Sequence, residues 1–338
     1  MRKVGVETVR VVFDWAAVQP YASFADVPPD QLARFTDVGG VPTDFATTDA
    51  FVSATAAQGL RVLPVLIRAP AWAVDGPASY NAPPADNATF ARFAAAMVGR
   101  YGQSGSFWTG RKVRVPIRDW QVWNEPNLGT YWAIQPDWAP TYAALLKSAA
   151  TAIRNADRSA RVVTAGLTNG SRSTAWEALA KLYAAGAKGS FDVVALHPYT
   201  RKVAGIIETT EHVRSVMRKR KDIKPIALTE ISFSSSNGDS PDRYATWDTT
   251  ESGQAKAATS ALRTIAKERK RLGIRQVSWY SWLSPMASRA AWSEYSGLSR
   301  MSGTRVVRKP ALAAYARIAL PLEGRPVPGP YSRPRKSK

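Results

Sequence analysis

The 338-residue sequence has no cysteine and only two histidines. Without cysteine the chain has no disulfide bond, no thiolate nucleophile and no metal site built on thiolates. With His197 and His212 as the only imidazoles, we do not expect a histidine-rich metal site either. We therefore look for chemistry among carboxylates, amides and aromatic side chains.

The sequence also lacks long apolar runs. None reaches the ~18 residues that a transmembrane helix needs, so we expect no membrane span. Residues 1–7 contain no apolar segment of the kind found in a signal peptide. No strand-like segment leads into a glycine-rich phosphate loop, neither G-x-G-x-x-G nor G-x-x-x-x-G-K-[ST]. These absences argue against a nucleotide-binding fold of the doubly wound type.

Acidic residues are few, 26 against 46 lysines and arginines, and the net charge is +20. Basic residues cluster at 214–221, 263–275 and 325–338. The ordinary interpretation is solvated helix faces and a solvated tail. The alternative is attraction to an anionic partner such as an acidic polysaccharide or the cell envelope. No nucleic-acid-binding motif accompanies the charge, so we expect no nucleic acid partner.

Short β-branched segments alternate with amphipathic ones along the chain. The pattern predicts helices at residues 48–58, 86–101, 139–156, 174–187, 205–220, 253–272 and 310–319. It predicts strands that begin at Val4, Arg61, Ile117, Arg161, Phe191, Pro225 and Ile274. Such alternation is typical of a parallel sheet wrapped by helices. No internal linker divides it, so we expect one domain at residues 1–320 and a disordered, basic, Pro-rich tail at 321–338.

Two glutamates come at the ends of predicted strands. Glu125 lies in Trp123-Asn124-Glu125-Pro126-Asn127, where the proline should stop the strand because it cannot donate a ladder hydrogen bond. Glu230 follows the apolar segment 226–229 and precedes a serine-rich loop. For Glu230 alone, an ion-paired structural carboxylate is the competing interpretation. Barrel enzymes keep their sites at strand C-terminal ends, which favours a (β/α)8 barrel over the doubly wound fold.

The segment Trp123–Asn127 resembles the acid/base segment of the clan A retaining glycoside hydrolases, a (β/α)8-barrel group with many cellulases, xylanases, mannanases and β-xylosidases. The resemblance implies that Glu125 ends strand four as acid/base and that Glu230 ends strand seven as nucleophile. Val9–Val11 then resembles strand two, so the barrel lacks its first strand in this chain. We expect that the chain starts late and that a signal peptide was lost with that strand; a seven-stranded barrel is the alternative.

The resemblance also implies roles for five neighbours of the two glutamates. Asn124 is similar to the asparagine that binds the sugar 2-hydroxyl, and Arg10 to the arginine beneath the nucleophile, with a structural ion pair as the alternative. His197 and Tyr199 match a His-x-Tyr after strand six, whose tyrosine contacts the nucleophile. Trp282 resembles the platform for the sugar at the cleavage site. Further loop candidates, each more typical of packing, are Trp15, Trp72, Trp132 and Trp247.

These implications together predict a glycosidase that hydrolyses O-glycosidic bonds of a β-linked oligo- or polysaccharide by retaining double displacement, with no metal or organic cofactor. The basic surface favours an anionic glycan. The alternatives are a catalytically inactive carbohydrate-binding relative, a transglycosylase that remodels cell-envelope glycans, and a basic protein that binds acidic polymers. We expect a monomer that is secreted or associated with the cell envelope and takes part in polysaccharide degradation.

Overall fold

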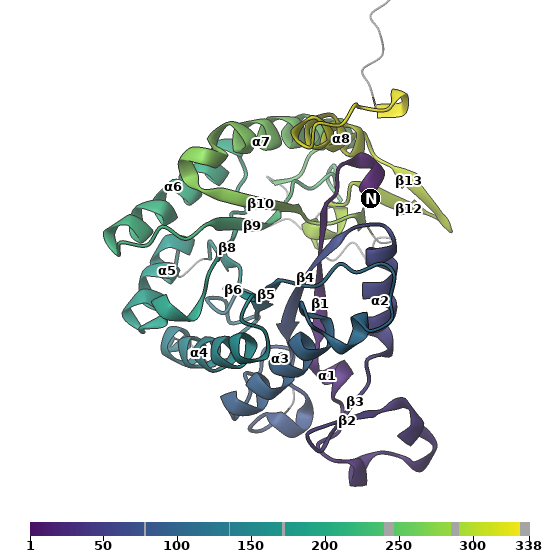
Figure 1. The fold of residues 1–338 in the computed structure, drawn as a ribbon. Helices are drawn as coiled ribbons and strands as arrows, with labels where there is room; N and C mark the ends of the chain where they lie inside the picture. Colours follow the sequence, from purple (N-terminus) through teal and green to yellow (C-terminus); the bar gives the residue numbers. More distant parts are fainter. Residues whose placement is uncertain (78, 135, 171–172, 240–246, 285–290, 332–338) are drawn as a thin grey trace, which may run out of the picture. The chain divides into compact units, whose positions relative to one another are not determined.

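The computed structural model describes the chain except residues 78, 135, 171–172, 240–246, 285–290 and 332–338 (Figure 1). Its contacts divide the chain into two compact units. Unit 1 consists of residues 1–7, 197–215 and 226–338, and unit 2 of residues 8–196 and 216–225. We describe each unit by itself.

Unit 2 is built on a parallel sheet with the strand order β1-β4-β5-β6. Strand β1 pairs with β4 along its whole length, from Thr8 opposite Arg61 to Asp14 opposite Ile67. Strand β4 is buried almost throughout, as its run of valine, leucine and isoleucine requires. The strands of this unit are β1 (Thr8–Asp14), β2 (Thr36–Val38), β3 (Val41–Thr43), β4 (Arg61–Ile67), β5 (Asp119–Val122), β6 (Arg161–Val163), β7 (Leu167–Thr168) and β8 (Val194–His197), whose last residue falls in unit 1.

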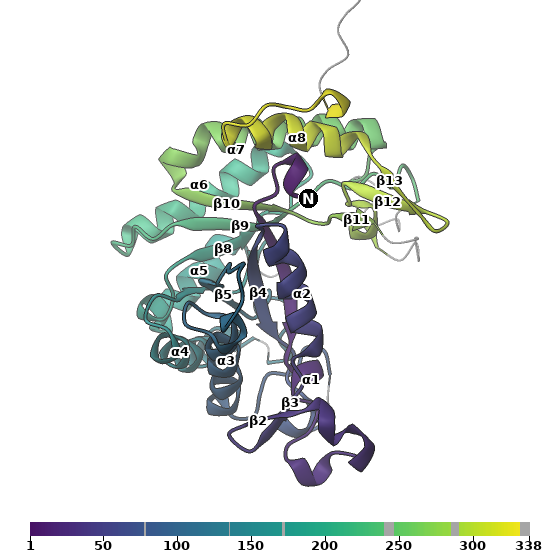
Figure 2. The ribbon, with the colours of Figure 1, turned by 45° about the vertical axis from the view of Figure 1, so that its right-hand side comes forward.

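Helices α3 and α5 of unit 2 begin at side chains that cap them. Asp86 accepts from Ala88 N at the start of α3, and Thr174 forms a capping box with Glu177 at the start of α5. Helices α3 and α4 lie side by side (Figures 1 and 2). The helices are α1 (Trp15–Val18), α2 (Ala46–Ala57), α3 (Asn87–Tyr101), α4 (Trp138–Ala156) and α5 (Ala175–Ala184).

Unit 1 combines a parallel strand pair with long helices. Its strands are β9 (Ile226–Ile231), β10 (Ile274–Trp279), β11 (Leu283–Ser284), β12 (Ser299–Ser302) and β13 (Arg305–Arg308). Its helices are α7 (Glu251–Leu272), α8 (Pro310–Leu322) and the part of α6 (Val203–Lys219) up to Ser215. Helices α7 and α8 lie side by side (Figure 2). The apolar core of the unit contains Val4, Leu298, Ala311, Leu312, Ala316 and Leu320.

The predicted class, parallel strands with helices between them, is confirmed, but several boundaries differ. Strand β1 starts at Thr8 rather than Val4, because Arg2–Val4 form a 3-10 turn that ends at Gly5 with φ 89°. A Cβ on Gly5 would lie 2.7 Å from the Ala319 Cβ, so only glycine fits there. Strand β5 ends at Val122, three residues before the expected Glu125.

The predicted helices are all present, with starts that shift by a few residues. Helix α2 begins at Ala46, before the expected cap Thr48, whose hydroxyl instead donates to Phe45 O. Helix α7 begins at Glu251 because Thr250 caps it. The short strands β2, β3 and β11–β13 were not predicted, since each has only two to four residues inside a loop. Among the described residues no helix has the length and apolarity to cross a membrane.

The structure describes residues 321–331 of the segment for which the sequence predicts a disordered tail. Helix α8 continues to Leu322, and a 3-10 turn forms at Gly329–Tyr331. Arg325 donates to Arg2 O and to the Glu323 carboxylate. The same carboxylate also accepts a hydrogen bond from the Arg2 guanidinium. These return contacts to the N-terminus hold a segment whose composition alone suggested disorder. Residues 332–338 lie outside the described part.

A buried lysine joins the start of helix α8 to the 3-10 turn Trp292–Tyr295. Lys309 is 3% exposed, and its Nζ donates to Tyr295 O at 2.7 Å. The same carbonyl accepts a hydrogen bond from the Ser235 hydroxyl, so it keeps a partner without the lysine. Burial lowers the Lys309 pKa to about 8.

We predict that Lys309→Met changes how stability depends on pH. A lysine whose pKa is about 8 when folded and 10.5 when unfolded makes the wild type more stable as pH rises through that window, because the unfolded state binds more protons. The difference in unfolding free energy, variant minus wild type, should fall by about 1–2 kcal/mol between pH 7 and 10.5, allowing for solvent screening. Urea unfolding at several pH values measures it. A pH-independent difference would contradict the prediction.

Candidate active site

The chain turns sharply where β5 ends, and Glu125 lies in that turn. Trp123 N still donates to Leu66 O at 2.9 Å, and then Trp123 and Glu125 take φ values of 69° and 40°. Residues other than glycine adopt such values at a cost of about 1–3 kcal/mol each, and they cluster at functional sites. The Trp123 indole donates to Tyr131 O, and Asn127 Nδ2 donates to Thr168 O. Glu125 itself is 7% exposed, so the turn holds a buried carboxylate.

A tyrosine from α4 bridges β5 and β6 where their ladder stops. The last paired residues are Gln121 and Val163. Beyond them the Tyr142 hydroxyl donates to Val122 O at 2.8 Å and accepts from Ala165 N at 2.7 Å. Tyr142 is fully buried, and burial raises its pKa, so it stays protonated and keeps its donor. The hydroxyl therefore satisfies both backbone groups just before the Glu125 turn.

Arg10 orients two side-chain amides, one in β5 and one just after it. Its Nε donates to Gln121 Oε1 and its Nη2 to Asn124 Oδ1, both at 2.7 Å. Gln121 in turn donates to Thr164 O. Because Asn124 Oδ1 accepts from arginine, its Nδ2 is the group left to donate, which suits an oxygen acceptor such as a sugar hydroxyl. The predicted roles of Asn124 toward a sugar and of Arg10 toward the nucleophile stay predictions.

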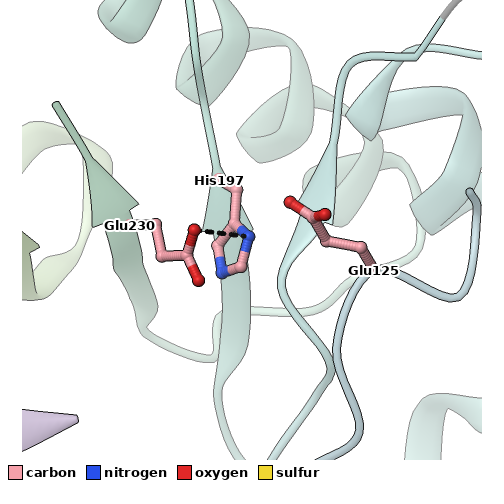
Figure 3. A group of neighbouring side chains, drawn as sticks. All are labelled: Glu125, His197 and Glu230. Carbon is pink, nitrogen blue, oxygen red and sulfur yellow. Dashed lines mark ion pairs between the residues drawn. The ribbon is translucent and has the colours of Figure 1, made fainter. Parts of the chain in front are cut away.

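In unit 1, one side chain binds the Glu230 carboxylate near the end of β9 and another lies close to it. The Tyr199 hydroxyl donates to Glu230 Oε2 at 2.6 Å. The Nδ1 atom of His197 is 3.6 Å from the same oxygen, a pair that is ionic only when the imidazole is protonated (Figure 3). His197 is 0% exposed. Figure 3 also labels Glu125, which belongs to unit 2.

An aromatic group extends from Tyr199. The Trp292 ring packs edge-on against Tyr199, with centroids 5.3 Å apart, and Trp247 lies 6.1 Å from Trp292. Trp247 is one of the loop candidates from the sequence, whereas the sequence does not single out Trp292. Trp292 begins a four-residue 3-10 turn, which is too short for a periodic signal, and its place beside Tyr199 depends on the path of the chain after β10.

Three of the loop tryptophans, and Trp282, pack against other apolar side chains. Trp15 and Trp132 are 0% and 1% exposed in the core of unit 2. Trp72 packs edge-on against Trp15. Trp282 lies beyond the end of β10 and packs against the apolar core of unit 1. Its role as a sugar platform stays a prediction.

Parallel strands joined by helices, with carboxylates at strand ends, are the arrangement of α/β enzymes that keep their sites at that end. The family model "Glycosyl hydrolase catalytic core" matches residues 117–306, which include both glutamates. The chain belongs to this family. The resemblance that Trp123–Asn127 suggested is thereby confirmed.

Solved structures of glycoside hydrolases share the fold at low identity. A family 39 glycoside hydrolase from Bacteroides cellulosilyticus WH2 matches with a TM-score of 0.63 at 18% identity, over 94% of this chain and 59% of that one. A monomeric β-xylosidase from Caulobacter crescentus CB15 matches with a TM-score of 0.59 at 18% identity, over 93% of this chain and 62% of that one. A family 51 α-L-arabinofuranosidase from Bifidobacterium longum matches with a TM-score of 0.61 at 12% identity, over 94% of this chain and 65% of that one.

The chain spans about three-fifths of the length of these structures. A search of curated proteins finds no match. The comparisons therefore establish the family and the fold, while activity and substrate belong to the proposal below.

We predict that Tyr142→Phe destabilises the chain by about 2–3 kcal/mol, because it leaves Val122 O and Ala165 N buried without their shared partner. Chemical denaturation measures the loss. Tyr80→Phe is the control, since its side chain is 48% exposed and the change should cost less than about 0.5 kcal/mol. Equal stability of Tyr142→Phe and wild type would show that the hydroxyl does not support the strand end.

Proposed function

We propose that the protein is a retaining glycosidase that hydrolyses O-glycosidic bonds of a β-linked oligo- or polysaccharide. The observation that carries the proposal is the Glu230 carboxylate near the end of β9, held by the Tyr199 hydroxyl inside the segment that matches the family. Glu125, in a strained turn after β5 in the same segment, supplies a second carboxyl group. Hydrolysis with retention needs two such groups, ~5–5.5 Å apart.

In the first step Glu230 attacks the anomeric carbon and forms a glycosyl-enzyme ester. The bond from that carbon to the leaving oxygen breaks as the Glu125 carboxyl group donates its proton to the oxygen. The hydrogen bond from the Tyr199 hydroxyl orients the Glu230 carboxylate for the attack. Asn124 Nδ2, fixed by Arg10, is suited to bind the sugar 2-hydroxyl, a contact that strengthens in the transition state.

In the second step water replaces Glu230 at the anomeric carbon. The Glu125 carboxylate accepts a proton from water while the ester bond to Glu230 breaks, which restores both side chains. Two inversions at one carbon retain its configuration. The residues that we assign require no metal or organic cofactor.

The finer structural and cellular predictions belong to the same proposal. We place the parallel strands in a (β/α)8-type barrel, as the fold neighbours support. The names of those neighbours, a β-xylosidase and an α-L-arabinofuranosidase, make aryl pentosides the first substrates to assay. The net charge of +20 supports an anionic natural glycan and a place outside the cell or in its envelope. We propose a monomer.

We predict that Glu125→Gln and Glu230→Gln fail in different ways. Glu125→Gln should lower kcat by about 10²–10⁴ on substrates with poor leaving groups, because no acid assists departure. It should retain turnover of aryl glycosides with acidic phenols, and azide, which needs no general base, should restore the second step. Glu230→Gln should reduce turnover of both substrate types to background, because no ester forms. Steady-state rates over a series of phenols measure the difference.

The configuration of the first product separates the mechanisms. Retention, followed by NMR, supports double displacement, whereas inversion would make Glu230 a base and contradict it. Sugar binding without any hydrolysis by the wild type would favour an inactive carbohydrate-binding relative. Transfer to added oligosaccharides in preference to water would favour a transglycosylase.

We predict that Tyr199→Phe lowers kcat by about 10- to 100-fold with little change in KM, because the variant loses a hydrogen bond to a charged carboxylate. Tyr331→Phe, in the C-terminal 3-10 turn, is the matched control and should match the wild type. An unchanged kcat for Tyr199→Phe would remove that residue from the proposed mechanism.

A further inference from the structure

One large apolar side chain is exposed far more than the others that the structure describes. Ile223 is 94% exposed, and the next most exposed, Val306, is 58% exposed. Ile223 lies in the loop between α6 and β9. Burying an isoleucine side chain is favourable by about 1.5–3 kcal/mol, so the loop leaves this free energy unused.

The loop holds Ile223 in this position. On the side before it, Lys221 has φ 49° and its neighbour Asp222 is 4% exposed. Asp222 Oδ2 accepts from the Tyr183 hydroxyl at 2.8 Å and from Lys224 Nζ at 3.0 Å. Asp222 Oδ1 accepts from Lys224 N at 3.0 Å. Hydrogen bonds therefore fix the residues on both sides of Ile223, and its exposure results from the conformation of this loop.

Both oxygens of the Asp222 carboxylate accept hydrogen bonds within this loop and from Tyr183. Burial raises its pKa, but the bonds from Lys224 N, the Tyr183 hydroxyl and the Lys224 ammonium outweigh burial and lower the pKa below its usual value. Asp222 is the only acidic residue in 218–224. Buried and paired with Lys224, it neutralises that lysine and leaves Arg218, Lys219, Arg220 and Lys221 as the exposed cations of the loop.

Basic residues lie on both sides of Ile223 in the chain. Residues 218–221 are Arg-Lys-Arg-Lys, and all four are exposed. The exposed Lys188 belongs to the same surface, because its Nζ donates to Arg220 O at 2.8 Å and to Lys221 O at 3.3 Å. We call residues 218–224 with Lys188 the basic tip. It presents one apolar side chain among clustered cations.

This combination favours one kind of anionic partner. A sulfated or carboxylated glycan would bind the cations and would gain nothing from Ile223. A bilayer with anionic lipids uses both features, since lysine and arginine bind phosphate headgroups and an apolar side chain enters the acyl boundary. We propose that the basic tip docks the protein reversibly on an anionic lipid surface. The proposal does not depend on the hydrolase function.

Sedimentation with lipid vesicles tests the proposal on the full chain. Wild type should bind vesicles in which about one lipid in three is phosphatidylglycerol, should not bind pure phosphatidylcholine, and should be released by high salt. Ile223→Ser should weaken binding to the anionic vesicles by about tenfold, because only the apolar contact is removed. Arg220→Gln/Ile223→Ser should weaken it further.

Strand β13 offers a matched control. Arg305→Gln/Val306→Ser removes one exposed cation and one exposed apolar side chain elsewhere in the chain and should leave binding unchanged. Since Ile223 and Arg220 are exposed, circular dichroism should show that both variants fold as the wild type does.

Three outcomes would overturn the proposal. Equal binding to both vesicle types would show that anionic lipid is not recognised. An equal loss of binding in the β13 control would show that the basic tip is not the binding site. If Ile223→Ser binds as the wild type does while Lys219→Gln/Arg220→Gln does not, the tip is a general polyanion surface. Competition by a soluble sulfated glycan would then confirm that alternative.

Discussion

The C-terminal end of β5 depends on satisfying backbone groups where the β5–β6 ladder stops. An unpaired buried N–H or C=O costs about 1–3 kcal/mol, so separating two strands is unfavourable unless side chains replace the lost bonds. Tyr142 bridges Val122 O and Ala165 N, and Gln121 reaches Thr164 O. This replacement lets β5 end early and turn into the segment that contains Glu125.

The two glutamates are presented by different physical means. Glu125 depends on backbone geometry, with positive φ values at Trp123 and at Glu125 itself. Glu230 is the next-to-last residue of the buried strand β9, and its carboxylate is oriented by the Tyr199 hydroxyl with His197 nearby. A carboxylate in a strained turn and a carboxylate held by donors suit the different roles of proton transfer and nucleophilic attack in the proposed reaction.

The charge of the chain is organised rather than uniform. Some cations are built into the fold, as Lys309 is through Tyr295 O and Arg10 through two amide oxygens. Others are exposed, and in the basic tip a buried Asp222 shapes the loop and pairs with Lys224 rather than with the exposed cations at 218–221. Net charge alone could not distinguish these uses, because burial and pairing decide which cations a partner meets.

The sequence by itself determined the class of fold, the helices and the Glu125 segment. These depend on signals that act over a few residues: alternating periodicity, caps such as Asp86, and the proline after Glu125. The tertiary structure decided the end of β5, the place of Trp292 beside Tyr199, and the order of residues 321–331. Those features result from contacts between residues far apart in the chain, and such contacts depend on strand register and packing, which no local pattern encodes.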